Sequence, residues 1–393
     1  MRKILFCITT LNGGGAEKAL CNITLAMPDD VQIDILVNCE EPDKDYNHRG
    51  NVIPITSVSN SKIRIPFPVK VFLGRYYKLF QLKKKGGYDA CISFMDKSNI
   101  ANILTGDKYC KVILSERTTL SKAVLGRHIK FFAKQLYKKA DWVVTVSNGV
   151  RDDLSLNFNV PLEKLTTIYN GFDFDLIRRQ SEEELGFKFD FGSFYFLNTG
   201  RVDEPKGQWH LIRAFAAVKK KHSECRLIIC GKGPYMEMLE EMTKDYGLEN
   251  DIFLMGVVKN PYAVSRNCDV FVFPSMYEGM PNALVENMVC GLPVIATDFR
   301  SGAREILAPG TDYSFQNSEN IEMAEYGIIV PVCSGEKKSA DEELETEERI
   351  LSEAMLRLVE DSELRKYYGG QSLKRAQDFS IDRKVTQWLE LLG

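Results

Sequence analysis

The sequence predicts an α/β protein with two domains, each built around a parallel β-sheet. The chain has 393 residues, which is too long for one ordinary core and suits two substantial domains. Short runs rich in Val, Ile and Phe alternate with amphipathic helical patterns, as is typical of βα units in a parallel sheet. This alternation occurs twice along the chain, which gives one sheet to each half.

The first domain is expected over residues 1–185 and the second over residues 193–361, with residues 186–192 as a hinge that carries no sustained period. Strands are expected in the first domain at 3–9, 31–37, 89–94, 111–115, 142–147 and 165–169. Strands are expected in the second domain at 194–199, 226–230, 251–255, 269–273, 293–297 and 327–330. Amphipathic segments such as 208–221 and 234–246 separate them as helices.

The end of the chain departs from this alternation. Residues 335–349 are dominated by acidic side chains and are expected to form an exposed insertion before a helix at 350–359. Two helical patterns then follow, at about 362–378 and 381–392, with no strand between them. Residues 362–393 are therefore expected to cross back and brace the first domain.

The composition excludes several protein classes. With 44% hydrophobic and 27% charged residues, the chain is globular and not disordered as a whole. The ten cysteines contain no C-x2-C pair, which favours reduced thiols in the cytosol over a zinc site or a disulfide framework. The apolar run 4–8 is too short for a signal sequence or a membrane span, and no other run approaches 18–20 apolar residues. We therefore expect a cytoplasmic protein that is neither exported nor integral to a membrane.

Basic residues are concentrated in one segment of a chain whose formal net charge is −3. Residues 62–139 hold 18 Lys and Arg against four Asp and Glu, a net charge of +14, which leaves −17 for the remainder. This asymmetry indicates an acidic partner: nucleic acid, anionic lipid or a phosphorylated substrate. The alternative is a set of solvated helix faces.

Open α/β sheets bind ligands at the carboxyl ends of their strands, so the strand-to-helix junctions are candidate sites. The first candidate is Asn12-Gly13-Gly14-Gly15-Ala16-Glu17, where glycines let backbone N–H groups approach an anion at a helix N-terminus. A tight turn explains these glycines equally well. The segment is neither G-x-G-x-x-G nor a P-loop, because it lacks Gly-Lys-Ser/Thr.

The second and third candidates lie in the second domain. Arg201 and Lys206 lie in the turn after the strand expected at 194–199, and together they offer a donor fork and a point charge for a diphosphate. The third candidate, Glu278-Gly279-Met280-Pro281-Asn282-Ala283-Leu284-Val285-Glu286, follows the strand expected at 269–273. Pro281 suits the first turn of a helix, where backbone amides 280–283 would point at a bound anion or hydroxyl group.

Together these motifs resemble the retaining glycosyltransferases of the GT-B type, specifically family GT4. The string from Glu278 to Glu286 is similar to the E-x7-E signature of that family. The resemblance covers essentially the whole chain, and its other elements occur in the expected order: Gly13–Glu17, Val146–Val150, Ile168–Asp173, the Arg201/Lys206 turn, Cys230–Pro234 and Tyr326–Val330.

The resemblance implies two Rossmann-like domains that face a central cleft, with a sugar nucleotide held mainly by the second. Arg201 and Lys206 would bind the diphosphate in place of a metal ion, and Glu278 would hold the donor sugar beside them. Glu286 would accept hydrogen bonds from the ribose. The other donor-binding positions implied by the resemblance are Gly14, Gly15, Gly200, Gly231, Val257, Gly279, Met280, Pro281, Asn282 and Ala283.

One position departs from the family pattern. Many relatives carry a histidine just after the strand that here ends at Glu116, whereas this chain has Arg117, which is left as an acceptor-side candidate. The DxD-like sequence Asp173-Phe174-Asp175 lies in a loop that the family shares, so it is not expected to bind a metal. Neither a metal ion nor any other cofactor is expected.

The basic segment contains two helical patterns. In 69–85, apolar residues including Val69, Leu73 and Leu79 are expected to share the buried face, with Lys70, Arg75, Lys78 and Lys85 away from it. In 122–139, a cationic stripe is formed by Arg127, Lys130, Lys134 and Lys138. Such helices lie either on the sheet with a solvated basic face or against an anionic membrane. The resemblance favours the membrane and a lipid-linked acceptor over a soluble one, and no motif indicates nucleic acid.

The sequence thus predicts a metal-independent retaining glycosyltransferase that uses a nucleotide sugar, expected to be UDP-linked, in surface polysaccharide biosynthesis. It is expected in the cytoplasm, peripheral on the inner face of the cell membrane, with a glycan or lipid-linked saccharide as acceptor. The general pattern resembles transferases of N-acetylhexosamines, but the sequence does not fix the sugar. Two alternatives stay open: a non-catalytic subunit that binds nucleotide sugars, and a GT-B epimerase of sugar nucleotides.

Overall fold

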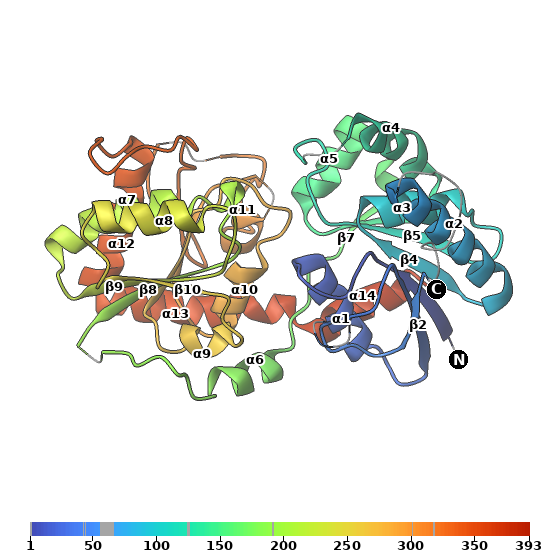
Figure 1. Ribbon diagram of the computed structural model, residues 1–393, viewed down its shortest axis with the longest axis horizontal. Helices are drawn as coiled ribbons and strands as arrows, with labels where there is room; N and C mark the ends of the chain where they lie inside the picture. The colour runs from blue at the N-terminus through green and yellow to red at the C-terminus, as the bar shows by residue number, and fades with distance from the viewer. Residues whose placement is uncertain are drawn as a thin grey trace. The chain divides into compact units, whose positions relative to one another are not determined.

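The computed structural model (Figure 1) describes residues 2–41, 43, 45–55, 67–123, 126–190, 192–300, 302–316 and 319–393. Residues 62–66 and 124–125 of the basic segment, and residue 191 of the expected hinge, lie outside the described residues. The chain divides into two compact units, Met1–Phe172 with Phe379–Gly393 (unit 1) and Asp173–Asp378 (unit 2). In the described part of the chain each unit is built on one seven-stranded sheet, so the predicted α/β class with two parallel sheets is confirmed.

The sheet of unit 1 is parallel throughout and has the order β3-β2-β1-β4-β5-β6-β7. Its strands are β1 Arg2–Cys7, β2 Val31–Val37, β3 Asn51–Pro54, β4 Ala90–Phe94, β5 Lys111–Glu116, β6 Trp142–Thr145 and β7 Leu165–Thr167. Its helices are α1 Gly15–Ala26, α2 Phe67–Gly86, α3 Asp96–Leu104, α4 Arg127–Leu136, α5 Asn148–Phe158 and α14 Ile381–Glu390. The four-residue edge strand β3 was not predicted.

Two apolar layers sandwich the unit 1 sheet. On one face α1 and α14 pack side by side over β1, β2 and β4, with Leu20 and Trp388 in the core (Figure 1). On the other face the second layer contains Ile100 of α3, Ala133 of α4 and Leu154 of α5. Because these parallel strands are buried on both faces, most of their residues are apolar, and the strands form nearly continuous apolar runs in the sequence.

The sheet of unit 2 has the order β10-β9-β8-β11-β12-β14-β13, and only the edge strand β13 runs antiparallel. Its strands are β8 Phe194–Thr199, β9 Cys225–Cys230, β10 Ile252–Gly256, β11 Val270–Phe273, β12 Val294–Thr297, β13 Glu322–Met323 and β14 Ile328–Val330. Its helices are α6 Phe174–Ser181, α7 Gln208–Lys221, α8 Met236–Asp245, α9 Pro261–Ser265, α10 Asn282–Val289, α11 Ala303–Leu307, α12 Thr346–Glu360 and α13 Ser362–Ala376. The two-residue strand β13 was not predicted.

The boundary between the units lies earlier in the chain than the expected hinge at 186–192. Residues after Phe172 already belong to unit 2, and the aromatic side chains of the expected hinge pack within that unit. Phe187 contacts the Phe253 ring with centroids 5.2 Å apart, and Phe189 contacts the Tyr195 ring at 4.9 Å. The segment is aperiodic because it is a packed connector rather than a regular element.

The expected return of the chain at 362–393 is only half right. Helix α13 belongs to unit 2, where the buried Tyr368 hydroxyl donates to the Ala324 carbonyl oxygen at 3.0 Å. The chain re-enters unit 1 at Phe379, whose carbonyl oxygen accepts from the Phe172 amide at 2.9 Å. Only α14 therefore braces the first domain, with the Trp388 ring stacked on Phe94.

The predicted faces of helix α2 are only partly right. Leu79 is buried as expected, but Arg75 and Lys83, which precede and follow it by one turn, are buried with it. Arg75 donates to the Asn38 side-chain oxygen at 2.6 Å, and Lys83 donates to the carbonyl oxygens of Asn102 and Gly106 at 2.9 Å each. Polar partners from other elements therefore make burial of these cations possible. The opposite stripe, Val69, Leu73 and Tyr77, is exposed.

Candidate functional site

The predicted donor-binding residues of unit 2 follow the carboxyl ends of four adjacent strands, β10, β9, β8 and β11. The turn Glu204–Lys206 follows β8, and Gly207 ends it in the left-handed region (φ +59°) just before α7. A Cβ atom at Gly207 would lie 2.6 Å from the Pro274 carbonyl oxygen, and one at Gly231 would lie 1.7 Å from the Gly200 carbonyl oxygen. These glycines let the loops after β8, β9 and β11 approach one another closely.

Lys206 and Glu278 form an ion pair across these loops. Lys206 Nζ lies 2.5 Å from Glu278 Oε1, and both side chains are largely buried. The same carboxylate oxygen accepts from the Ser275 hydroxyl at 3.0 Å, and Lys206 Nζ lies 5.1 Å from the Phe273 ring centroid. The structure thus brings together two residues that the sequence separates by 72 positions. A preorganised cation of this kind can compensate negative charge on a ligand.

Arg201 has a different environment from Lys206. Its side chain is 75% exposed and its guanidinium forms a close ion pair with Asp203. The main chain beneath it is firmly held, because the Arg201 carbonyl oxygen accepts from the buried Gln208 side chain at 2.8 Å. Arg201 therefore presents an exposed, ion-paired charge on a turn whose main chain is held.

Glu286 lies one turn into α10, and Pro281 is the N-cap of that helix rather than a residue of its first turn. Glu286 Oε1 accepts a hydrogen bond from the Tyr262 hydroxyl at 3.1 Å. Not all amides of 280–283 point outward, because the Asn282 amide donates to the Met280 carbonyl oxygen at 3.1 Å. Val257, which follows β10, is 66% exposed.

In unit 1 the glycine loop leads directly into α1. Gly13 has φ +87°, Gly14 is the N-cap in an extended conformation, and Gly15 is the first residue of the helix. A Cβ atom at Gly14 would lie 2.4 Å from the Glu17 carboxylate. Burial raises the pKa of Glu17, and the nearby Arg117 charge partly opposes that rise. The loop thus lies beside the Glu17 carboxylate, within the electrostatic influence of the Arg117 cation.

Arg117 is buried at the end of β5, and its surroundings were not predicted. The guanidinium donates to the Asn170 side-chain oxygen in a close contact and lies 5.3 Å from the Phe94 ring centroid. Burial lowers the pKa of Arg117 to about 10, while the charges of Glu116 and Glu17 act in the opposite direction. Arg117 is therefore fixed in place and is not a mobile surface cation.

The neighbouring Glu116 is a functional candidate that sequence reasoning missed. It is fully buried, accepts from the Tyr137 hydroxyl at 2.9 Å and the Thr118 hydroxyl at 3.1 Å, and also accepts the Arg117 amide. Burial raises the pKa of Glu116 to about 7, and the charge of Asp96 adds to that effect while the hydrogen bonds oppose it. The available signal was an acidic residue at the end of an otherwise apolar strand.

The predicted cationic stripe is partly used within the fold. Lys130 is half-buried and donates to the Ser121 carbonyl oxygen at 2.8 Å, and Lys78 is also half-buried. Arg127, Lys134 and Lys138 are exposed, although Lys138 lies in a 3-10 turn after α4. Within the described residues no helix is both long and apolar enough to cross a bilayer.

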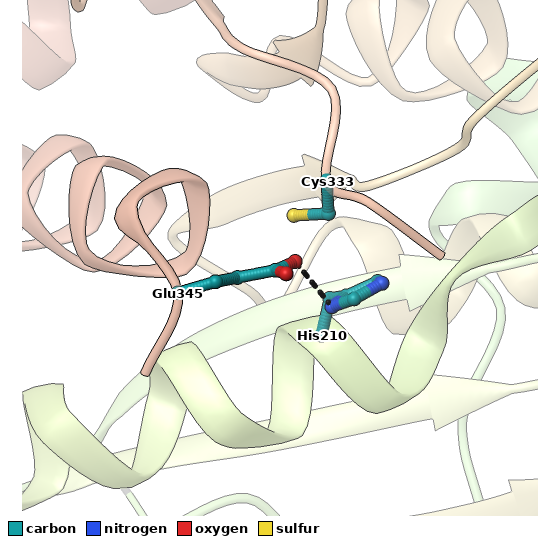
Figure 2. Close-up of side chains that lie close together, drawn as sticks. All are labelled: His210, Cys333 and Glu345. Carbon is teal, nitrogen blue, oxygen red and sulfur yellow. Dashed lines mark ion pairs between the residues drawn. The ribbon is translucent and has the colours of Figure 1, made fainter. Parts of the chain in front are cut away.

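One group of side chains in unit 2 has metal-like spacing among the described residues: His210, Cys333 and Glu345 (Figure 2). Its atoms already have other roles. His210 Nδ1 lies 2.8 Å from Glu348 Oε1 and 3.2 Å from Glu345 Oε1, so the Nδ1–H group donates hydrogen bonds to these carboxylates. Burial and the neighbouring carboxylates raise the pKa of the Cys333 thiol well above its usual value, which disfavours the thiolate that metals bind. The group fits a cap for α12 better than a metal centre.

Comparison with known proteins gives matches over both units. The family model described as Glycosyltransferase Family 4 matches residues 13–176, and the model described as Glycosyl transferases group 1 matches residues 181–330. An uncharacterized glycosyltransferase of Methanocaldococcus jannaschii is 31% identical over 353 residues, which are 84% of this chain and 86% of the relative.

Two further comparisons span almost the full chain. The N-acetylgalactosamine-N,N'-diacetylbacillosaminyl-diphospho-undecaprenol 4-alpha-N-acetylgalactosaminyltransferase of Campylobacter jejuni is 28% identical and covers 96% of each chain. The crystal structure of Anabaena HepE in complex with UDP superposes with a TM-score of 0.75 at 18% identity, covering 100% of this chain and 99% of that one. The fold is therefore GT-B, and the chain belongs to the group 1 glycosyltransferases of family GT4.

Proposed function

We propose that this glycosyltransferase is a metal-independent, retaining enzyme that transfers an N-acetylhexosamine from a UDP-sugar to a lipid-linked saccharide. The name of the Campylobacter relative specifies an N-acetylgalactosaminyl transfer to a saccharide on diphospho-undecaprenol, and Anabaena HepE was crystallised with UDP. The observation in this chain that carries the proposal is the Lys206–Glu278 ion pair at 2.5 Å.

In the proposed reaction the bond between the sugar C1 and the diphosphate oxygen breaks, and a bond from C1 to an acceptor hydroxyl oxygen forms on the same face. The bonding electrons leave with the nucleoside diphosphate, which then takes the acceptor proton. Lys206 and Arg201 stabilise the new negative charge, which is the task that a metal ion performs in other transferases. Glu278 holds Lys206 and hydrogen-bonds the donor sugar.

Donor recognition is assigned to the rest of the unit 2 group. Glu286 accepts hydrogen bonds from the ribose hydroxyls while the Tyr262 hydroxyl fixes its carboxylate. The exposed Val257 contributes to the base pocket, and Gly200, Gly231 and residues 279–283 shape the loops around the donor. Gly14 and Gly15 of unit 1 stay predicted diphosphate contacts.

The acceptor side is assigned to unit 1, with Arg117 at the carboxyl edge of its sheet. Exposed apolar and cationic side chains together support reversible binding of unit 1 to the anionic inner face of the cell membrane. In α2 the exposed stripe Val69, Leu73 and Tyr77 adjoins the basic Lys70, and α4 exposes Phe131 and Phe132 next to Lys134. Buried Arg75 and Lys83 take no part in this surface.

The test is a donor and acceptor matrix. UDP-N-acetylgalactosamine, UDP-N-acetylglucosamine, UDP-glucose and a GDP-sugar are each incubated with a polyprenyl-diphosphate-linked saccharide, and UDP or GDP release is measured. NMR of the product then gives the anomeric configuration. We expect acceptor-dependent UDP release and an α-linked product. Transfer from GDP-sugars alone, or an inverted linkage, would contradict the donor or the retaining assignment.

A further inference from the structure

The acidic segment 333–345, here called the acidic strap, connects β14 to α12 and is held against α7. Arg213 of α7 is fully buried and donates through Nη2 to the carbonyl oxygens of Glu343 at 2.8 Å and Glu342 at 3.2 Å. Its Nε atom lies 2.9 Å and 3.0 Å from the two carboxylate oxygens of Glu348. One buried guanidinium thus fixes the path of a segment without regular structure. The side chains of Glu336, Asp341, Glu342 and Glu343 are exposed as predicted. Glu345 and Glu348, which were also expected in the exposed insertion, are instead 8% and 1% exposed because they contact His210 and Arg213.

The strap is also attached to the first turn of α7. Figure 2 shows Glu345 pointing from the start of α12 toward His210 of α7. Glu345 Oε1 lies 3.2 Å from His210 Nδ1. Glu345 accepts in addition from the Ser334 hydroxyl at 2.6 Å. Trp209, which precedes His210 and is buried, donates through Nε1 to the Glu336 carbonyl oxygen at 3.1 Å. Both ends of the strap therefore lie against residues that directly follow the turn carrying Lys206.

From the strap, contacts continue to the turn itself. Lys337 Nζ lies 4.1 Å from the Tyr235 ring centroid and donates to the Tyr235 hydroxyl at 3.0 Å. That hydroxyl lies 3.4 Å from Glu204 Oε2, and the Tyr235 amide donates to the Val202 carbonyl oxygen at 3.2 Å. Tyr235 thus contacts the 201–206 turn with both its main chain and its side chain.

A second route connects the strap to the loop that carries Glu278. Gly335 has φ +84°, and a Cβ atom there would lie 2.9 Å from Met276 Sδ. The Met276 amide donates to the Pro205 carbonyl oxygen at 2.7 Å. The strap therefore lies against both loops that supply the Lys206–Glu278 pair.

We infer that Tyr235 and Lys337 are positioning residues through which the acidic strap holds the 201–206 turn in the conformation that binds the donor diphosphate. The inference rests on the proposed function of Arg201 and Lys206. Donors that stabilise a developing charge must be preorganised, and Arg201, which is largely exposed, depends on its turn for position. Contacts on the outer side of the turn supply that order.

The test compares UDP with uridine as calorimetric ligands, because only UDP carries the diphosphate. Tyr235→Phe removes the hydroxyl that joins Lys337 to Glu204, and Lys337→Met removes the cation while keeping a long side chain. We expect three- to tenfold weaker UDP binding by each variant with uridine affinity unchanged, and restoration by Lys337→Arg. Tyr368→Phe is the matched control, because its hydroxyl bonds Ala324 away from the turn.

A double-mutant cycle that combines Tyr235→Phe with Lys206→Ala tests the positioning role of Tyr235 separately from the diphosphate-binding role of Lys206. The effect of Tyr235→Phe on UDP binding should largely disappear in the Lys206→Ala background. If Lys206→Ala weakens UDP binding while Tyr235→Phe does not, the positioning role is wrong and the diphosphate assignment stands. Equal loss of UDP and uridine binding by Tyr235→Phe would show a general structural effect and would also overturn the positioning role. If Lys206→Ala has no effect, the proposed function fails and this inference fails with it.

Discussion

The hydroxyl group of Tyr262 lies 3.1 Å from Oε1 of Glu286 and donates a hydrogen bond to it. Tyr262 is buried at the start of α9, whereas Glu286 lies one turn into α10. The bond fixes the direction of the Glu286 carboxylate, and an oriented carboxylate is suited to the proposed contact with the ribose hydroxyl groups.

The first prediction concerns Glu286. Glu286→Gln should weaken UDP binding by about 1.5–3 kcal/mol, the usual loss for hydrogen bonds to a charged group. Tyr262→Phe should cause a smaller loss, because the carboxylate stays but is less well oriented. Calorimetry with UDP and with 2',3'-dideoxyuridine diphosphate measures both. The assignment to ribose is wrong if the dideoxy ligand shows the same loss as UDP.

The second prediction separates Glu278 from Glu286. Glu278→Gln removes the charge that pairs with Lys206 and should chiefly lower kcat for sugar transfer, with a smaller change in UDP affinity. Steady-state kinetics and UDP calorimetry on the same two variants provide the comparison. Equal losses of nucleotide affinity in Glu278→Gln and Glu286→Gln would refute the division of roles.

The third prediction concerns the cations. Replacing Arg201 or Lys206 with Ala should cost roughly 2–4 kcal/mol of transition-state stabilisation, as is typical of one preorganised electrostatic donor. Of the two, Lys206 should show the larger effect, because it is buried whereas Arg201 is 75% exposed. Wild-type turnover should survive EDTA. Loss of turnover with EDTA and its recovery with Mn²⁺ would show that a metal ion takes part.

The fourth prediction uses the pKa of Glu116, which burial raises to about 7 from an ordinary 4.5. Because the folded protein holds this proton more tightly than the unfolded chain, the contribution of Glu116 to stability is present below pH 4.5 and is lost as the pH rises to 7. The loss is roughly 3 kcal/mol. Glu116→Gln should therefore gain thermal stability relative to wild type at pH 8 and not at pH 5. A difference between the two proteins that is the same at both pH values would contradict this.

The fifth prediction concerns the membrane. Arg127→Glu together with Lys134→Glu should reduce cosedimentation with anionic vesicles, because each basic residue contributes about 1 kcal/mol at the surface. Tyr77→Ser and Phe131→Ser should reduce it further by removing exposed apolar area. UDP binding should stay unchanged in all variants. Glu163→Lys adds a cation elsewhere in unit 1 as a control. If wild-type protein does not bind anionic vesicles at low salt, the membrane assignment is wrong, and the basic residues of these helices form a solvated face.

The sequence was sufficient for the buried strands of both sheets, because parallel strands buried on both faces leave nearly continuous apolar runs. The short edge strands β3 and β13 leave no such pattern and were not predicted. The faces of α2 were predicted only in part, for a physical reason. Arg75 and Lys83 are buried because Asn38, Asn102 and Gly106 bind them, and no local pattern reveals such partners. The Lys206–Glu278 pair likewise depends on the approach of two loops that only the fold brings together.

The return of the chain at Phe379 has a consequence for how the protein is made. The strands of unit 1 are synthesised before unit 2, yet the face of Phe94 that stacks on Trp388 stays uncovered until residues 379–393 have been synthesised. Unit 2 is contiguous from Asp173 to Asp378 and can complete its core earlier. A nascent chain that stops after Asp378 would therefore carry a finished C-terminal unit and an unfinished N-terminal one, so that the unit translated first matures last.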